Sequence, residues 1–194
     1  MNTPAHLAAS LLAWRNEPGW RGALAVSFGA VLPDLPMFGF FAFQKFIGTD
    51  EYEIWDTLYF QPHWQTFFDI FNSIPLALLV ALVCVYLRQP LLIMMACSAI
   101  LHMLCDLPVH HDDGHRHFWP IDWRFASPVS YWDPKHYGAI VAPIELLFAV
   151  IASGWLSFSA PHKPMRVIAR INLGFYVLVG LMILGFFMRK WMFA

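Results

Sequence analysis

The sequence predicts an all-α membrane protein, a polytopic helical bundle with about five spanning helices and a short N-terminal helix. Of its 194 residues, 59% are hydrophobic and only 13% are charged, and the mean hydropathy is +0.54. A soluble domain usually carries about 25% charged residues, so this chain has too few polar groups to cover a globular surface in water. We find no internal repeat and expect a single integral-membrane domain over residues 1–194.

Apolar runs separated by polar links define the expected helices. Thr3-Pro4 predicts a helix start, with Thr3 as the cap. The helix over residues 4–14 is too short to span a bilayer, which needs about 20 residues. The expected spans are residues 22–43, 67–87, 91–106, 138–158 and 171–187. Between them we expect an exterior loop over residues 44–65 and a long functional loop over residues 107–137.

One stretch, residues 102–117 (HMLCDLPVHHDDGHRH), concentrates imidazole and carboxylate groups more densely than any other part of the chain. His102 and Asp106 are four residues apart and therefore share one face of a helix. Both side-chain types bind metals, and both transfer protons near neutral pH. Ionisable residues inside a membrane segment indicate a functional site. The stretch predicts a metal site at the mouth of the bundle.

The order of the spans brings further ligand-type residues to the same side. If residues 4–14 and 22–43 form an antiparallel hairpin, His6 and Asp34 lie at comparable depth, because a helix rises about 1.5 Å per residue. Alternating the later spans puts His63 on the side of residues 102–117. Lys and Arg in the short opposite loops favour a cytoplasmic location for that other face. We therefore expect a site that faces outward, towards the periplasm.

Structural interpretations stay open for each candidate. His102 and Asp106 fit a buried His–Asp pair, Asp34 fits a helix cap after a proline, and residues 110–117 fit a solvated loop. Glu145, near the start of a predicted span, fits either a metal ligand or a partner for an arginine. Asp69 and Asn72 are expected to cap or to form hydrogen bonds.

Four motifs carry a resemblance to a known family: AHLAAS, VLPDLP, ILHMLCD and FWPIDWRF, in this order. Through them the chain resembles the LexA-regulated, membrane-bound metal-dependent hydrolases from residue 6 to residue 128. That family is similar to zinc-dependent phospholipase C and single-strand nucleases, which hold zinc with His and Asp on a helical bundle and cleave phosphate esters. The resemblance implies five ligands: His6, Asp34, His63, His102 and Asp106. The chain departs at residues 62–65 (PHWQ), where the family often has Thr-His-Ser.

The full set of expected site residues follows from the residues and the resemblance together. The expected cofactor is a divalent metal, Zn²⁺ first, in one to three copies. Its candidate ligands are His6, Asp34, His63, His102, Asp106, His110, His111, His115, His117 and His136. The catalytic candidates are Asp106 as a bridging carboxylate, Asp112, Asp113 or Asp133 as a general base, and Arg116 or Arg124 as a phosphate-binding group.

We expect a membrane-embedded metal-dependent hydrolase that cleaves a phosphate ester, with phospholipids among the candidate substrates. Its expected place is the bacterial inner membrane, reached without a removable signal peptide. A net charge of −1 and the lack of a basic, aromatic-interleaved patch give no reason to expect nucleic-acid binding. The alternatives are a non-catalytic metal-binding membrane protein and a small ion or metal transporter. The sequence does not indicate an oligomeric state.

Overall fold

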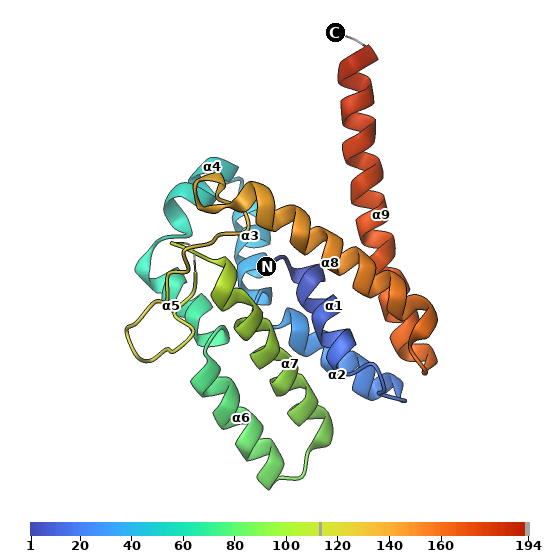
Figure 1. Cartoon of the computed structure of the whole chain (residues 1–194). Helices are drawn as coiled ribbons and strands as arrows, with labels where there is room; N and C mark the ends of the chain where they lie inside the picture. The colour runs from blue at the N-terminus through green and yellow to red at the C-terminus, as the bar shows by residue number, and fades with distance from the viewer. Residues whose placement is uncertain (113, 193–194) are drawn as a thin grey trace.

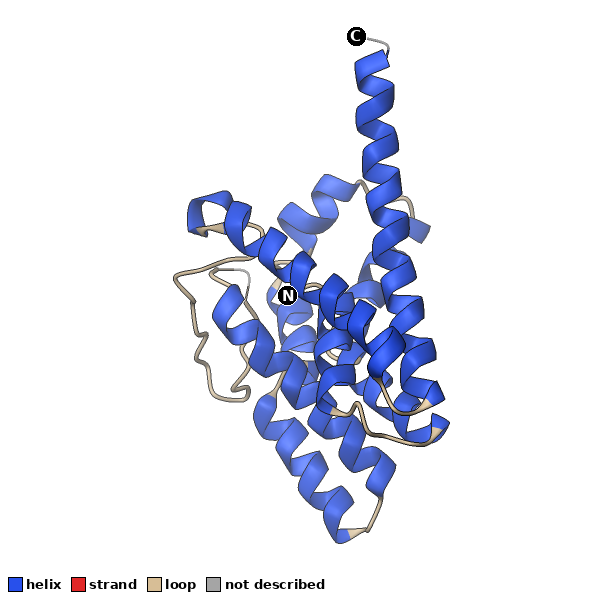
Figure 2. Ribbon diagram, turned by 45° about the vertical axis from the view of Figure 1, so that its right-hand side comes forward, coloured by secondary structure: helices blue, strands red, loops and turns tan. Residues whose placement is uncertain are grey.

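The computed structural model describes residues 1–112 and 114–192 and consists of helices joined by loops (Figures 1 and 2). In chain order the helices are α1 (Thr3–Ala13), α2 (Trp20–Val31), α3 (Leu35–Phe46), α4 (Glu51–Glu53), a π-helix (Ile54–Leu58), α5 (Pro62–Phe71), α6 (Ile74–Tyr86), α7 (Pro90–Asp106), two 3-10 turns (Leu107–Val109 and Pro134–His136), α8 (Gly138–Ser159) and α9 (Lys163–Met192).

Four segments are long and apolar enough to cross a membrane: Pro62–Tyr86, Pro90–Val109, Gly138–Ser159 and Lys163–Met182. The pair α2 and α3 would make a fifth span, bent by 64° where Leu32, Pro33 and Asp34 separate the two helices. Large apolar side chains cover the outer faces of the later helices, including Leu82, Phe158 and Leu181. The predicted all-helical membrane fold, with four to five spans and a short α1, is therefore confirmed. By the length and hydropathy of its helices, the chain is an integral membrane protein.

Two predicted boundaries were wrong. The expected exterior loop over residues 44–65 contains α4 and the π-helix, because Ile54 and Tyr59 are buried against Phe40 and Phe68. Helix α9 begins at Lys163, eight residues before the predicted 171. Its first turns carry three basic residues, which suggested a link, but they also bury Met165 and neighbouring apolar side chains in the core.

The start of α1 also differs from the prediction. Asn2, not Thr3, is the cap, since its side-chain oxygen accepts a hydrogen bond from the backbone N–H of Ala5. The Thr3 hydroxyl instead donates to the Asp34 carboxylate. The two segments that were expected to form a hairpin are thus joined directly at this end.

Small residues let α1, α2 and α7 approach closely. A Cβ added at Gly29 would lie 2.1 Å from the Met95 carbonyl oxygen, so the backbones of α2 and α7 approach each other closely at this point. The buried Ser98 hydroxyl of α7 donates to the Val26 carbonyl of α2 (2.7 Å) and lies 2.9 Å from the Ser10 hydroxyl of α1. One turn further along α7, and one turn back along α1, lie His102 and His6.

A hydrogen bond joins the break between α5 and α6 to the break between α2 and α3. Asn72, between α5 and α6, donates to the Pro33 carbonyl, between α2 and α3, at 3.1 Å. The His117 carbonyl accepts from the Ile74 backbone N–H, and the Ser73 hydroxyl donates to the Trp119 carbonyl at 2.6 Å. The long loop over residues 107–137 is thereby fixed to the break between α5 and α6.

Candidate metal centre

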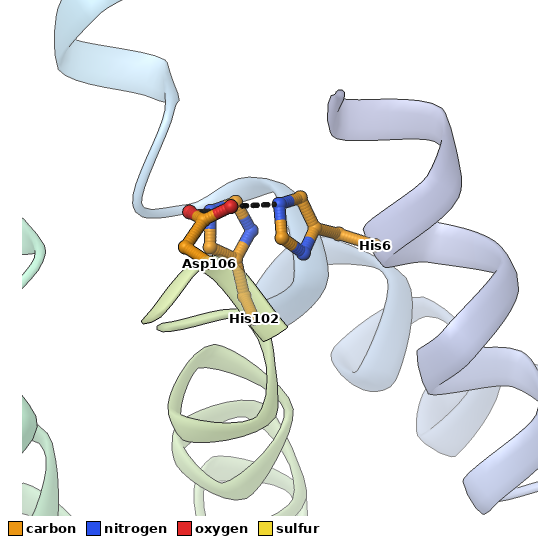
Figure 3. Close-up of side chains that lie close together, drawn as sticks. All are labelled: His6, His102 and Asp106. Carbon is orange, nitrogen blue, oxygen red and sulfur yellow. Dashed lines mark ion pairs between the residues drawn. The ribbon is translucent and has the colours of Figure 1, made fainter. Parts of the chain in front are cut away.

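His6, His102 and Asp106 meet where α1 begins and α7 ends (Figure 3). We call these three residues the central cluster. Asp106 Oδ1 lies 2.9 Å from His6 Nε2, and Asp106 Oδ2 lies 3.2 Å from His102 Nε2. All three are buried, with exposed fractions of 1%, 0% and 4% in chain order. Because α1 and α7 run antiparallel with their small residues in contact, the two histidines face each other from neighbouring helices.

A backbone carbonyl fixes the orientation of His102. Its Nδ1 lies 2.7 Å from the Ala30 carbonyl oxygen, which can only accept, so Nδ1 carries the proton. In the neutral ring, Nε2 then presents a lone pair towards Asp106 and towards Asp34 Oδ1, 3.5 Å away. Nε2 has no hydrogen-bond partner among the described residues. A lone pair facing two carboxylates is repelled unless a proton or a metal ion lies between them.

His6 stacks on His102, with ring centroids 3.5 Å apart and planes 14° apart. Neither ring nitrogen of His6 forms a hydrogen bond of good geometry within the described part of the chain. Burial lowers the pKa of His6 to about 4, so its ring is uncharged near neutral pH. Two stacked imidazoles with unused nitrogens are a costly arrangement unless something binds those nitrogens.

Two carboxylates and one amine lie around the cluster. Asp34 and Asp106 both border His102, and neither pairs with a Lys or Arg side chain in the described structure. The Met1 amine lies 2.5 Å from Asp106 Oδ1 and 3.0 Å from His110 Nε2. His110 Nε2 is itself 3.2 Å from Asp106 Oδ1. The Met1 amine is a cationic partner of Asp106, and a divalent cation would compensate the buried Asp106 and the partly exposed Asp34 together.

The donor set fits such an ion. One nitrogen from each histidine and one Asp106 oxygen all lie within 4.8 Å of one another. Two histidines and one carboxylate are a ligand set found in catalytic zinc sites. The hydrogen bond from His102 Nδ1 to a backbone carbonyl is the outer contact that usually orients a metal-binding histidine. Asp34 and His110 lie at the border of the cluster and can add a fourth ligand.

Other predicted ligands belong to a second region, which we call the Asp69 cluster: Asp69, His115, Arg116, His117 and Asp122. Asp69 is fully buried and accepts from the backbone N–H (2.9 Å) and from Nε (2.6 Å) of Arg116. Arg116 also donates to Asp122 Oδ1 at 2.9 Å, and these contacts raise the pKa of the guanidinium. Burial lowers the pKa of His117 to about 4, and its Nδ1 lies 3.1 Å from the Asn72 carbonyl. Arg116 is thus engaged by carboxylates rather than open to a phosphate.

The remaining candidates lie elsewhere on the loop or outside it. His111 stacks on His136, which in turn contacts Asp133. Arg124 donates to the Asp112 carbonyl and to Gln65 Oε1. Asp112 is exposed, and Asp113 lies outside the described residues. His63 is exposed on α5 beside Trp64 and is not among the residues that meet at the central cluster.

Three residues near the start of α1 contact one another in a way that the sequence did not predict: Asn2, Glu145 and Tyr176. Glu145 of α8 is buried, and its Oε1 accepts from the Asn2 backbone N–H at 2.7 Å. Its Oε2 is buried without a partner in the described structure. Tyr176 of α9 donates to Asn2 Oδ1 at 2.9 Å. As an acid inside an apolar run, Glu145 stands out in the sequence as a candidate functional residue. The sequence does not show that it contacts the start of α1.

Comparison of this chain with models of protein families, with curated proteins and with solved structures finds no match. The resemblance to membrane-bound metal-dependent hydrolases therefore stays a prediction. Function is inferred below from the donor atoms, burial and charge of the central cluster.

Proposed function

We propose that this protein is a membrane-embedded, metal-dependent hydrolase that cleaves a phosphate ester at or near the membrane surface. The observation that carries the proposal is the buried meeting of two imidazoles and a carboxylate with a second carboxylate alongside. Such a donor set suits Zn²⁺ or a similar divalent ion. When bound, the ion would supply a water of pKa about 7 and polarise the phosphoryl group.

The residues around the cluster would divide the remaining tasks. His6, His102 and Asp106 would hold the ion. Asp34 Oδ1, 3.5 Å from His102 Nε2, suits either a further ligand or a group that accepts a proton from attacking water, and Thr3 fixes its other oxygen. This placement favours Asp34 as the base over Asp112, which lies exposed on the loop.

Arg124 is the better of the two predicted phosphate-binding arginines. Arg116 is paired with Asp69 and Asp122, whereas Arg124, among the residues that the structure describes, donates only to neutral oxygens, those of Asp112 and Gln65. Its positive charge is therefore not cancelled by these contacts, and a guanidinium can bind phosphate through two hydrogen bonds. Arg124→Ala should raise KM more than it lowers kcat.

A lipid is the substrate class that this setting favours. The cluster lies at the end of α7, a membrane-spanning helix, and its border residues Asp34 and His110 are more exposed than its centre, with side-chain exposures of 13% and 16%. A phosphorylated headgroup at the bilayer surface would approach from this border. We further propose the bacterial inner membrane as the location, with the site facing outward.

The test combines metal analysis with turnover. Purified protein loaded with Zn²⁺ or Mn²⁺ is incubated with phospholipid vesicles and with a small phosphate monoester, and released phosphate or headgroup is measured. His102→Ala and Asp106→Asn should lose both the bound metal and activity, while His162→Ala, on the α8–α9 link, should keep both. Full activity in both cluster variants would refute the proposal.

Deep burial favours one competing function, a metal-binding protein without turnover, because structural metal sites are closed to substrate. In that case wild-type protein would hold one ion tightly, and His102→Ala would unfold at lower temperature, yet no ester would be cleaved. A transporter is the third prediction, and metal uptake into proteoliposomes would test it.

A further inference from the structure

We propose that the end of the bundle opposite the central cluster binds the phosphate of an anionic phospholipid through three arginines: Arg15, Arg166 and Arg170. We call these residues the arginine surface. They come from the α1–α2 turn and from α9, yet all three contact the last turns of α8. The lipid proposed here is not the substrate, and the inference does not rest on the proposed hydrolysis.

Packing brings the α1–α2 turn and the α8–α9 link together at this end. One apolar core joins them, in which Leu11 of α1 and Ala23 of α2 pack with Leu156 of α8 and Met165 of α9. Figure 1 shows the two links side by side, at the end of α1 that lies away from the N-terminus. His6 lies near the start of α1, so the arginine surface and the central cluster are at opposite ends of that helix.

The carbonyl end of α8 holds two of the guanidinium groups in place. Arg170 Nη2 donates to the Ser157 carbonyl at 3.1 Å. Arg166 Nη1 donates to the Ala160 carbonyl at 2.9 Å and to the Pro161 carbonyl at 3.2 Å. A guanidinium has five N–H donors, so each of these arginines keeps donors for a phosphate. Because both groups are oriented before a ligand arrives, binding loses less entropy.

Carboxylates do not compensate the positive charge of this end. Among the residues that the structure describes, none of the three arginines forms an ion pair. Glu17 is the only acidic residue in residues 1–33, and its Oε1 accepts from a backbone N–H at 3.1 Å. Residues 146–194 contain no acidic residue, whereas Arg21 and Lys163 add two exposed cations beside the links. An uncompensated cationic surface of this kind attracts an anion.

The position of the arginine surface in the membrane makes a lipid the anion that fits it. The spans formed by α8 and α9 meet at this link, so the arginines lie where the helices leave the bilayer. The Arg15 guanidinium carbon lies 5.4 Å from the ring centre of Trp155, and tryptophan is enriched at this depth. Phe158 and Ile171, next to these contacts in the chain, are 81% and 67% exposed. A phospholipid covers such apolar side chains with its acyl chains, and basic pockets between spanning helices on the cytoplasmic side bind anionic headgroups.

Native mass spectrometry of the full chain in detergent, titrated with phosphatidylglycerol or with phosphatidylcholine, tests this proposal. Wild type should bind phosphatidylglycerol more tightly than phosphatidylcholine, and the preference should shrink as the ionic strength rises. Arg15→Gln and Arg170→Gln should each weaken the binding of phosphatidylglycerol roughly fivefold, the effect of one cation at an anionic lipid surface. Binding of phosphatidylcholine should stay at the wild-type value in both variants.

Two control variants separate a defined lipid site from general attraction. Arg88→Gln removes a charge from the α6–α7 link on the same side of the bundle, and Arg124→Ala removes one near the proposed substrate side. Both should keep the tight phosphatidylglycerol. A loss in either control equal to that in Arg170→Gln would overturn the proposal, as would displacement of the lipid by an equal concentration of inorganic phosphate. Equal affinity of wild type for the two lipids would also overturn it, whether or not an arginine variant folds.

Discussion

The central cluster and the Asp69 cluster both bury a carboxylate beside histidines, but they compensate its charge differently. Asp69 accepts from the backbone and the guanidinium of Arg116, so the protein itself supplies the opposing charge. Asp106 faces two imidazoles, one of which also faces Asp34, and in the described structure its cationic partner is the Met1 amine rather than a Lys or Arg side chain. The Asp69 cluster is therefore complete as it stands, whereas Asp34 and the buried ring nitrogens of the central cluster leave that cluster suited to an added cation.

This difference divides the stretch over residues 102–117, which is one dense run in the sequence. His102, Asp106 and His110 belong to the central cluster or its border, His111 stacks on His136, and residues 115–117 hold the loop to the break between α5 and α6. Similar residue types at similar density thus serve separate tasks. The two clusters differ in that a guanidinium and a backbone N–H together satisfy Asp69, whereas imidazoles and the Met1 amine surround Asp106.

The largest expected effect on stability comes from removing the compensated carboxylate charge. Asp69→Asn leaves the Arg116 guanidinium without its buried partner, and breaking a buried ion pair from one side costs about 3–5 kcal/mol. Because the Arg116 side chain is 22% exposed, we expect the lower end of this range. Thermal unfolding in detergent measures it. Metal content should stay at the wild-type value, and a loss of metal would mean that the two clusters are not separate.

A smaller effect is expected from filling the contact between α2 and α7. Gly29→Ala would place a Cβ 2.1 Å from the Met95 carbonyl oxygen, so the helices must move apart. Overpacking of this kind costs about 1–3 kcal/mol. The shift also moves the Ala30 carbonyl that orients His102, so the affinity for metal should fall too. Gly39→Ala, where the added Cβ meets nothing within 4 Å, is the matched control.

The pH dependence of the free energy of unfolding should report on the Asp69 cluster, through His117. Burial lowers the folded-state pKa of His117 from 6.5 to about 4, so the unfolded chain binds more protons between these values. The contribution of His117 to stability is present above pH 6.5 and is lost as the pH falls towards 4, by at most about 1.4 kcal/mol per pH unit. In metal-free protein, His117→Gln should flatten this slope. A slope unchanged by the substitution would assign the pH dependence to other groups.

The sequence predicted the meeting of His6, Asp34, His102 and Asp106, because helix periodicity and hairpin depth fix where helical residues lie. Their role as metal ligands stays a prediction. The loop contacts could not be predicted, since residues 107–137 have no regular period that gives side-chain directions. The Glu145 contact with Asn2 was missed because it joins residues 143 positions apart. The Asn2 cap is local and was missed because Thr3 is also a residue type that caps helices. The early start of α9 was missed because its basic residues outweighed its apolar face.

The most direct test of the central claim is the metal content of purified protein, measured by elemental analysis together with thermal unfolding before and after treatment with a chelator. We predict about one tightly held divalent ion per chain in the wild-type protein, and a lower unfolding temperature once it is removed. The Asp106→Asn variant should contain no tight ion, and the chelator should not change its unfolding temperature. Equal metal content and equal chelator response in the two proteins would contradict the account.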